Sequence, residues 1–320
     1  MATFKRGLSE KALCQLAKLA GSQTDNWWKD LLALWGPSGT GKAERPLRLA
    51  VRNNYLNFYL RGQSVARVAF DRQNHPFVDV HVKYAFSGAT EQAYARLTGA
   101  DIVHPKNGHS ATYMGASSLR EWMARAAKWE TAEKAEVERV VADNAGVIDL
   151  EMGLPAHLDQ TAMRMDLVAL ELGAGATNIV FWEAKRITDA RLKSKAGAPE
   201  VTEQVKSYHS YLTVEAHRLG IIKAYAEPCR LLKNFADWAG ASGKPLLLDP
   251  LVRNIAKNPD GLDLDITPRL VIFGTEDQLS APGWKAHQAK LVGEHRVPVL
   301  TIKTGDYRLN PPETVGGAAT

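Results

Sequence analysis

The segment 163–185 constrains the fold more than any other stretch of the chain. It contains two apolar runs, 167–172 and 179–182, separated by Gly173 and Gly175. This pattern predicts a β-hairpin with a glycine-containing turn. In the second run apolar residues occupy both alternating faces, which is typical of a strand covered on both sides. We therefore expect the hairpin to lie inside a buried sheet.

Charged residues follow at the end of the second predicted strand. Glu183 and Lys185 share a face with Ile179 and Phe181. Burying these charges is costly unless something compensates them. Asp166, at the start of the preceding strand, can lie beside them across the ladder. Two carboxylates at one sheet edge favour a divalent cation, because oxygen ligands suit Mg²⁺ or Mn²⁺. Lys185 would then orient or activate a water, or balance charge on a phosphate. An ordinary salt bridge between Glu183 and Lys185 at a strand end is the alternative.

Asp166 followed by Glu183-Ala184-Lys185 resembles the Asp…(Asp/Glu)-x-Lys signature of the restriction-endonuclease-like PD-(D/E)xK nucleases. A helical segment and a strand at 147–154 precede the signature. A helix containing Gln204 follows it, similar to the glutamine-containing helix of many family members, and two further strands come after. The resemblance covers roughly residues 117–305. It implies an α/β fold with a restriction-endonuclease-like core, in which helices flank a mixed central sheet.

The same resemblance implies a metal-dependent endonuclease that hydrolyses phosphodiester bonds, with DNA as the expected substrate. It implies catalytic roles for Asp166, Glu183, Lys185 and Gln204. Asp166 and Glu183 would hold Mg²⁺ or Mn²⁺ together with an acidic residue from the expected helix 117–143. Glu133 is the first choice, because its spacing from Val137 and Val141 places it on the inward face of that helix. Glu136, at the edge of that face, is the alternative.

A basic loop follows the signature. Its cationic residues are Arg186, Arg191, Lys193 and Lys195. Their position next to the expected site predicts contact with a phosphodiester backbone, although a charge run is also typical of a solvated loop. The formal net charge of +5 is compatible with an anionic partner.

A chain of 320 residues is long enough for two domains. We expect an N-terminal α+β domain at 1–115, a nuclease-like domain at 116–310 and a disordered tail at 311–320. In the first of these, 47–86 predicts an antiparallel meander, with a short helix around 91–97 after it. Arginines and tyrosines alternate along the meander, so it is either a nucleic-acid-binding face or an ordinary sheet with a solvated face.

The stretch 36–42 fits Gly-x-x-x-x-Gly-Lys, the phosphate loop of nucleoside triphosphatases. That loop needs a strand before it, a helix after it and a hydroxyl for Mg²⁺. Here a helix is expected before it, Ala43 replaces the hydroxyl and a strand-like run begins at Pro46. We interpret the stretch as a flexible linker. A nucleotide-hydrolysing switch is therefore a weaker hypothesis than a nuclease or a catalytically inactive nucleic-acid-binding protein on the same fold.

The remaining features bound the setting. No apolar run approaches the roughly 20 residues of a membrane helix, and no signal peptide is recognised, so a cytoplasmic protein is expected, with a homodimer as a candidate assembly. Cys14 and Cys229 do not suggest a metal site or a disulfide scaffold. Asp149 and Glu151 are either spare site acids or part of a half-exposed strand face. The proline-containing segment 226–264 is expected to be an irregular insertion.

Overall fold

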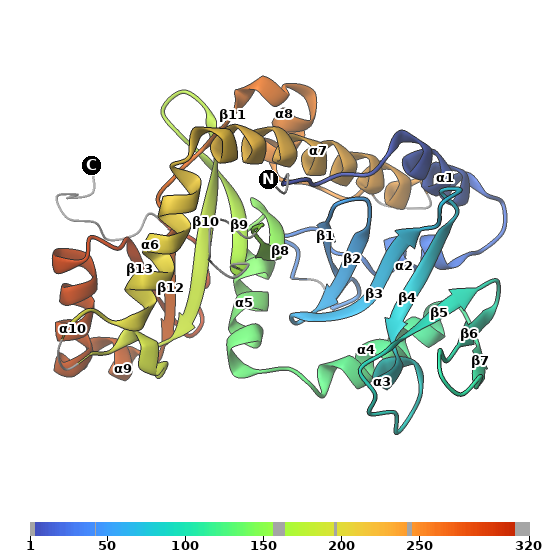
Figure 1. Cartoon of the computed structure of the whole chain (residues 1–320), viewed down its shortest axis with the longest axis horizontal. Coiled ribbons are helices and arrows are strands. Elements are labelled where there is room, and N and C mark those ends of the chain that lie inside the picture. Colours follow the sequence, from blue (N-terminus) through green and yellow to red (C-terminus); the bar gives the residue numbers. More distant parts are fainter. Residues whose placement is uncertain (1–3, 42, 156–163, 195–196, 242–244, 311–320) are drawn as a thin grey trace.

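The computed structural model describes residues 4–41, 43–155, 164–194, 197–241 and 245–310. Within these residues the protein has a mixed α/β fold with two sheets that stand side by side (Figure 1). The expected tail 311–320 and the predicted DNA contact Lys195 lie outside the described residues.

The first sheet is antiparallel, and its strands follow one another in sequence order. They are β1 (Arg48–Val51), β2 (Leu56–Leu60), β3 (Gln63–Phe70), β4 (Pro76–His81), β5 (Tyr94–Thr98), β6 (Asp101–Val103) and β7 (Ser110–Thr112). The predicted meander is confirmed. The short helix expected around 91–97 is wrong, because β5 alternates strictly and buries Ala95 and Leu97 on one face.

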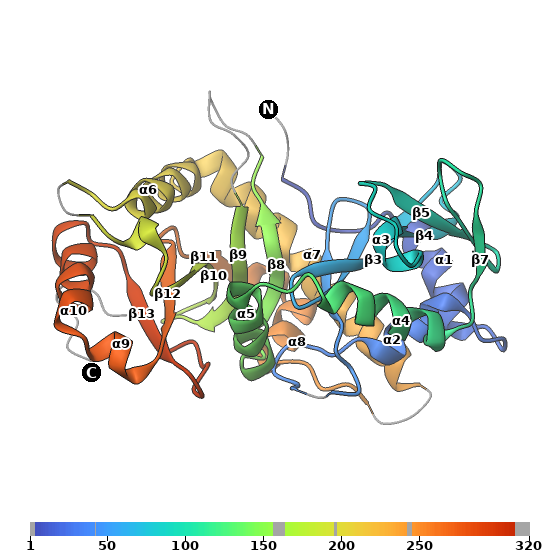
Figure 2. The same ribbon diagram turned by 90° about the horizontal axis from the view of Figure 1, so that it is seen from below.

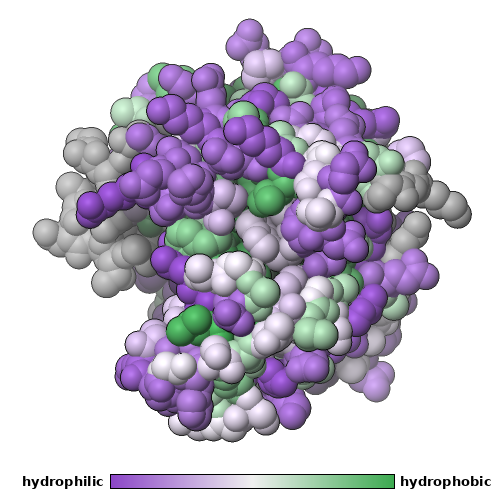
Figure 3. All heavy atoms as spheres, turned by 90° about the vertical axis from the view of Figure 1, so that its right-hand side faces the viewer, coloured by the Kyte–Doolittle hydropathy of each residue, from purple (hydrophilic) through white to green (hydrophobic). Residues whose placement is uncertain are grey.

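Four helices described in the N-terminal half pack on this sheet or at its ends. They are α1 (Glu10–Gly21), α2 (Trp27–Leu34), α3 (Val82–Ala85) and α4 (Ala116–Ala127). α2 begins where the Asn26 side chain accepts hydrogen bonds from the N–H groups of Trp28 and Lys29. The end of the molecule near β7 is largely hydrophilic, with hydrophobic residues in small separate areas (Figure 3).

The glycine-containing stretch runs from α2 to β1, so a helix precedes it and a strand follows, as expected. Its described part is tied to α5 (Ala132–Asp143) at Gly39. The Gly39 N–H donates to the Val141 carbonyl at 2.9 Å. The backbone of Gly39 has φ +76° and a Cβ there would meet Ala145, so this close approach requires glycine.

The second sheet has the strand order β13-β12-β10-β9-β8, and β11 also pairs with β10. Its strands are β8 (Val147–Gly153), β9 (Arg164–Leu172), β10 (Thr177–Arg186), β11 (Leu262–Leu264), β12 (Arg269–Gly274) and β13 (Val299–Lys303). The pairs β8–β9 and β9–β10 are antiparallel, whereas β11 and β12 join β10 in parallel. The predicted hairpin is confirmed, with Trp182 opposite Leu167.

Helices cover both faces of the second sheet. They are α5 (Ala132–Asp143), α6 (Glu200–Leu212), α7 (Glu215–Gly240), α8 (Pro250–Lys257), α9 (Glu276–Ser280) and α10 (Pro282–Ala289). α5 packs on the face that carries Val180 and Trp182, and α6 packs with α10 on the opposite face. No helix in the described ranges has both the length and the apolar character needed to cross a bilayer.

The single long helix expected at 117–143 is wrong. The chain leaves the helix after Ala127, and α5 starts at a new cap, where the Thr131 side chain accepts from the Lys134 N–H. α4 packs on the N-terminal sheet, whereas α5 packs on the second sheet. Both lie on the opposite side of the molecule from α7 (Figures 1 and 2).

The 26-residue helix α7 crosses from one half of the protein to the other (Figure 1). It contacts α1 and α2 at one end and α6 and β11 at the other. The irregular insertion expected at 226–264 is therefore wrong for 226–240, which continue this helix. One apolar cluster contains buried residues from both sides of residue 115. The division into 1–115 and 116–310 stays a prediction about roles, since the packing itself is continuous across it.

Asp149 on β8 of the second sheet joins that sheet to residues that pack with the first sheet. Its carboxylate is 2 % exposed and accepts from Arg6 Nε at 3.1 Å, from Tyr225 Oη at 2.9 Å and from Arg52. Burial would raise the pKa of Asp149, but Arg52 and Arg6 outweigh it and hold the pKa below its usual value. Asp149 is thus neither a spare site acid nor part of a half-exposed face.

Asp149→Asn should destabilise the fold by about 3–5 kcal/mol, because it leaves two buried guanidinium groups without their carboxylate. The free energy of unfolding in urea measures this. Since the pKa of Asp149 is lowered by folding, its contribution is complete above about pH 4 and disappears as the pH falls through the lowered value.

Asp237→Asn is the matched control, because Asp237 pairs with Lys233 on the exposed face of α7. It should unfold like the parent. An Asp149→Asn protein as stable as this control would contradict the role of the carboxylate in joining the two halves.

Candidate active site

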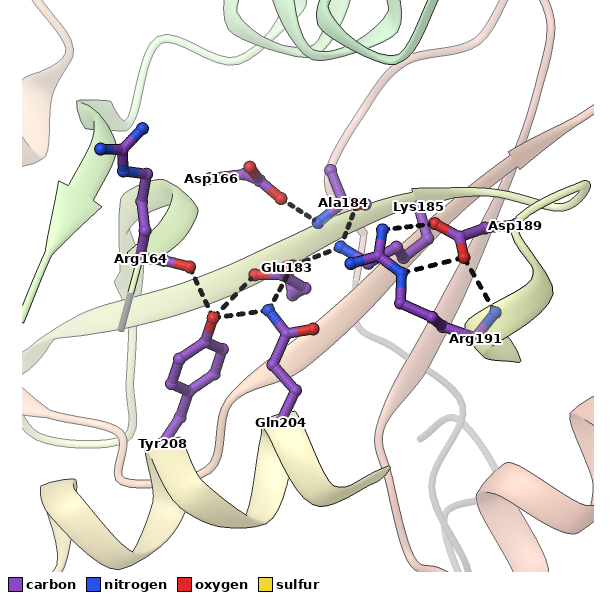
Figure 4. Close-up of polar contacts among 9 residues, drawn as sticks. All are labelled: Arg164, Asp166, Glu183, Ala184, Lys185, Asp189, Arg191, Gln204 and Tyr208. Atoms are coloured by element: carbon purple, nitrogen blue, oxygen red, sulfur yellow. Dashed lines mark hydrogen bonds and ion pairs between the residues drawn. The ribbon is translucent and has the colours of Figure 1, made fainter. Parts of the chain in front are cut away.

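β10 buries an acid and a base side by side. From Ile179 to Lys185 every residue of the strand is buried, and Glu183 and Lys185 are 4 % and 2 % exposed. The alternation of the strand turns both side chains away from α5 and toward α6 (Figure 4). The alternation in the sequence thus correctly predicts that Glu183 and Lys185 share one face of the strand.

Lys185 is held between two oxygens. Its Nζ contacts Glu183 Oε1 and donates to the Ala184 carbonyl at 3.0 Å (Figure 4). The ammonium therefore supplies positive charge to a carboxylate and a carbonyl at the same point of the strand.

Asp166 lies beside this pair on β9, as predicted. The β9–β10 register ends at Leu167 and Trp182, and the Asp166 side chain then takes the next hydrogen bond, accepting from the Ala184 N–H at 2.8 Å. Burial, and next the charge of Glu183, raise the pKa of Asp166 to about 8, more than Lys185 and the N–H lower it.

α6 supplies two polar side chains to Glu183. Gln204 Nε2 donates to Glu183 Oε1 at 2.7 Å and to Tyr208 Oη at 2.6 Å. Tyr208 Oη lies 3.3 Å from Glu183 Oε2 and also donates to the Arg164 carbonyl. Despite these contacts, burial raises the pKa of Glu183 above its usual value. Glu183 Oε1 therefore has two donors, Lys185 and Gln204, whereas Oε2 lies beside a hydroxyl whose one proton goes to the Arg164 carbonyl.

From the sequence, Gln204 is singled out on this helix but Tyr208 is not. The spacing contains the missing signal, because residues four apart lie next to each other on a helix. A tyrosine four residues after a site glutamine reaches the same carboxylate through its hydroxyl.

Both candidates for the predicted third carboxylate, Glu133 and Glu136, lie on α5. In the described ranges no three His, Cys, Asp or Glu side chains lie close enough to share a metal ion. Glu133 is in the first turn of α5, where its charge acts on Arg191, and Glu136 pairs with Arg139 at 3.0 Å. The assignment of Glu133 or Glu136 as a metal ligand stays a prediction.

The basic loop lies next to the site, but its charges differ in availability. Arg191 is bound to Asp189 by hydrogen bonds of 3.0 and 2.6 Å, and the pair lies near Lys185 (Figure 4). Arg186 and Lys193 are exposed. The guanidinium of Arg191 is thus already matched by a carboxylate, whereas Arg186 and Lys193 face solvent.

The donor set fits a hard divalent cation. Asp166, Glu183 and the Ala184 carbonyl offer oxygen atoms, which Mg²⁺ and Mn²⁺ prefer. The raised pKa values of both acids indicate that Lys185 alone does not compensate the two carboxylates.

No protein-family model, curated protein or solved structure matches the chain. Functional inference therefore rests on the signature in the sequence and on the geometry of these side chains.

The stability of the metal-free protein should fall as the pH rises from about 4 to 8. Folded Asp166 keeps its proton up to about pH 8, whereas the unfolded chain releases it near the ordinary value of about 4. The folded state thus binds more protons in this window. Asp166→Asn should flatten the dependence, and melting temperatures in EDTA at several pH values measure it.

Mg²⁺ at pH 8 should stabilise the parent more than Asp166→Asn, because the cation favours the ionised carboxylate. Asp237→Asn serves again as the control and should follow the parent. If the melting temperatures of the parent and Asp166→Asn in EDTA changed equally with pH, the raised pKa of Asp166 would be contradicted.

Proposed function

We propose that this protein is a metal-dependent nuclease that hydrolyses phosphodiester bonds, with DNA as its expected substrate and the cytoplasm as its expected location. The observation that carries the proposal is the cluster in which Asp166, Glu183 and Lys185 meet around Ala184. These are the positions of the Asp…(Asp/Glu)-x-Lys signature. A homodimer stays a prediction of the sequence.

The order of elements supports a restriction-endonuclease-like core. α5 is followed by β8, β9 and β10, then by α6, and β12, α10 and β13 come later in the chain. This is the order helix, three strands, helix, strand, helix, strand that the resemblance implies. α7, α8 and β11 stand between α6 and β12.

Burial of the charges also favours a chemical role. A buried ion pair contributes little to stability compared with well-packed apolar residues, because desolvation offsets the attraction. Here an ammonium and a carboxylate lie near the buried end of β10, and a second carboxylate lies near the start of β9, where apolar residues would pack well.

Each side chain then has a distinct task. Asp166, Glu183 and the Ala184 carbonyl hold the cation, which when bound polarises a phosphoryl oxygen and acidifies a water. Lys185 stabilises the charge that develops on phosphorus or handles the proton of the attacking water. Gln204 and Tyr208 fix the orientation of Glu183, so both are positioning residues.

A catalytically inactive nucleic-acid-binding protein on the same fold is the second candidate. It is favoured by the Lys185 and Gln204 donors on Glu183 Oε1, which also suit a structural ion pair. The two experiments below separate the candidates.

Asp166→Asn and Glu183→Gln should each reduce Mg²⁺-dependent cleavage by at least about 10²-fold, because each removes a carboxylate from the site. Plasmid, single-stranded DNA and RNA serve as substrates. The exposed control Glu215→Gln should cleave like the parent. If both site variants cut as fast as the parent, the assignment of the site is wrong.

Lys185→Met should reduce cleavage by about 10²–10⁴-fold. Its melting temperature in Mg²⁺ should stay near that of the parent, since the cation compensates Glu183. In the inactive candidate the same change removes one partner of a buried pair and costs about 3–5 kcal/mol. Strong destabilisation in Mg²⁺, with no cleavage by the parent, would favour that candidate.

A further inference from the structure

A polar groove lies between the two sheets and next to the candidate active site. It has a volume of about 520 Å³ and is lined by β2, β3 and β5 from the first sheet and by α5, β8 and β9 from the second. We call it the tyrosine groove, after Tyr55, Tyr59 and Tyr94 in its wall. Its volume is in the range of small-molecule and nucleotide sites.

The groove carries an excess of positive charge. Among the described residues that line it, Glu151 is the one acid. It is shared by Arg164 at 3.2 Å and Lys134 at 3.7 Å. Arg67 has no carboxylate partner in the described part of the chain, and its guanidinium lies 4.4 Å from the centre of the Tyr55 ring. Among the described residues, Arg67 thus lacks a carboxylate partner, and Lys134 and Arg164 have one carboxylate between them. The three cations therefore favour an anionic ligand.

The three rings differ in accessibility, and Tyr59 is buried. Tyr94 is 51 % exposed and Tyr55 is half-buried under Arg67. Bases of unpaired nucleic acid stack on such rings, whereas a duplex keeps its bases stacked on one another and offers mainly phosphates. The amides of Asn53 and Asn57 in the same wall can donate to and accept from base edges.

The groove and the candidate active site share an element. Arg164 lines the groove with its side chain, while its carbonyl accepts from Tyr208, which contacts Glu183. In the β8–β9 register Leu150 faces Leu167 and Met152 faces Met165, so Glu151 comes next to Asp166. The groove residue Glu151 on β8 is therefore the direct neighbour, across the β8–β9 pair, of the site acid Asp166 on β9.

We propose that the tyrosine groove binds an unpaired stretch of DNA and leads it to the candidate active site. A base stacks on Tyr94, and phosphates pair with Arg67, Lys134 and Arg164. The delivery step rests on the proposed nuclease function, whereas the binding step does not. The substrate class is then single-stranded DNA or the unpaired part of a junction.

The test is fluorescence anisotropy in EDTA with a labelled oligonucleotide of about 12 thymidines, a length within known site sizes. A duplex of equal length is the comparison. The parent should bind the single strand more tightly. Tyr94→Ala should weaken this binding by about 10-fold, and Tyr94→Phe should retain it, because stacking needs the ring and not the hydroxyl.

Arg67→Gln should lower the slope of log Kd against log salt by about 0.7, the loss of one phosphate contact on a single strand. Arg120→Gln is the matched control, since Arg120 is exposed on α4 and outside the groove. It should bind like the parent. Melting temperatures check that every variant folds.

Three outcomes would overturn the inference: duplex bound as tightly as the single strand, Tyr94→Ala and Arg67→Gln binding like the parent, or a polyglutamate peptide competing as well as the oligonucleotide. Failure of the two proposals is distinguishable. Binding that depends on Tyr94, with no cleavage under any metal, keeps the groove and rejects the nuclease. Cleavage that requires Asp166, with unchanged binding by the groove variants, keeps the nuclease and rejects the groove.

Discussion

The buried carboxylate of Asp149 is the contact on which the arrangement of the two sheets depends. It receives Arg6 from the N-terminal segment, Arg52 from the end of β1 and Tyr225 from α7. A carboxylate at this depth is tolerated because cations and a hydroxyl compensate it. Since these partners come from three distant parts of the chain, the ion cluster specifies how the halves meet. The apolar cluster around it provides most of the burial but has less directional preference.

The candidate site follows a different electrostatic rule. Around Asp149 the positive charges are sufficient, and the pKa of the acid is lowered. Around Asp166 and Glu183 they are not, and both pKa values are raised. In the first cluster the cations outweigh burial, whereas in the second burial outweighs the one buried ammonium.

The sequence predicts the parts of the fold that depend on local periodicity. The hairpin, the face of Glu183 and Lys185, and the meander of β1 to β4 follow from alternation and turn residues. The position of Gln204 is predicted from the resemblance to the PD-(D/E)xK nucleases and not from periodicity. The strand β5 is missed because its alternating residues are few, and the break before Thr131 is missed because both flanks have helical periodicity.

What the sequence does not predict depends on tertiary position. Asp149 alternates with apolar residues in the same way as an exposed acid does, and only the approach of Arg6 and Arg52 makes it buried. Glu133 has the expected inward spacing, but spacing alone does not say how close α5 brings it to Asp166 and Glu183. A period gives the face of a helix but not the depth to which its first turn reaches.

The continuity of α7 has a consequence for how this protein can be divided. The helix packs on α1 and α2 with one half and on α6 and β11 with the other, inside a core that both halves share. A chain cut near residue 115 would separate Phe235 from Trp28, whose rings lie 5.3 Å apart, and expose both to water. Neither piece would be a self-sufficient module, so recombination that exchanges one half alone would have to bring a compatible α7 with it.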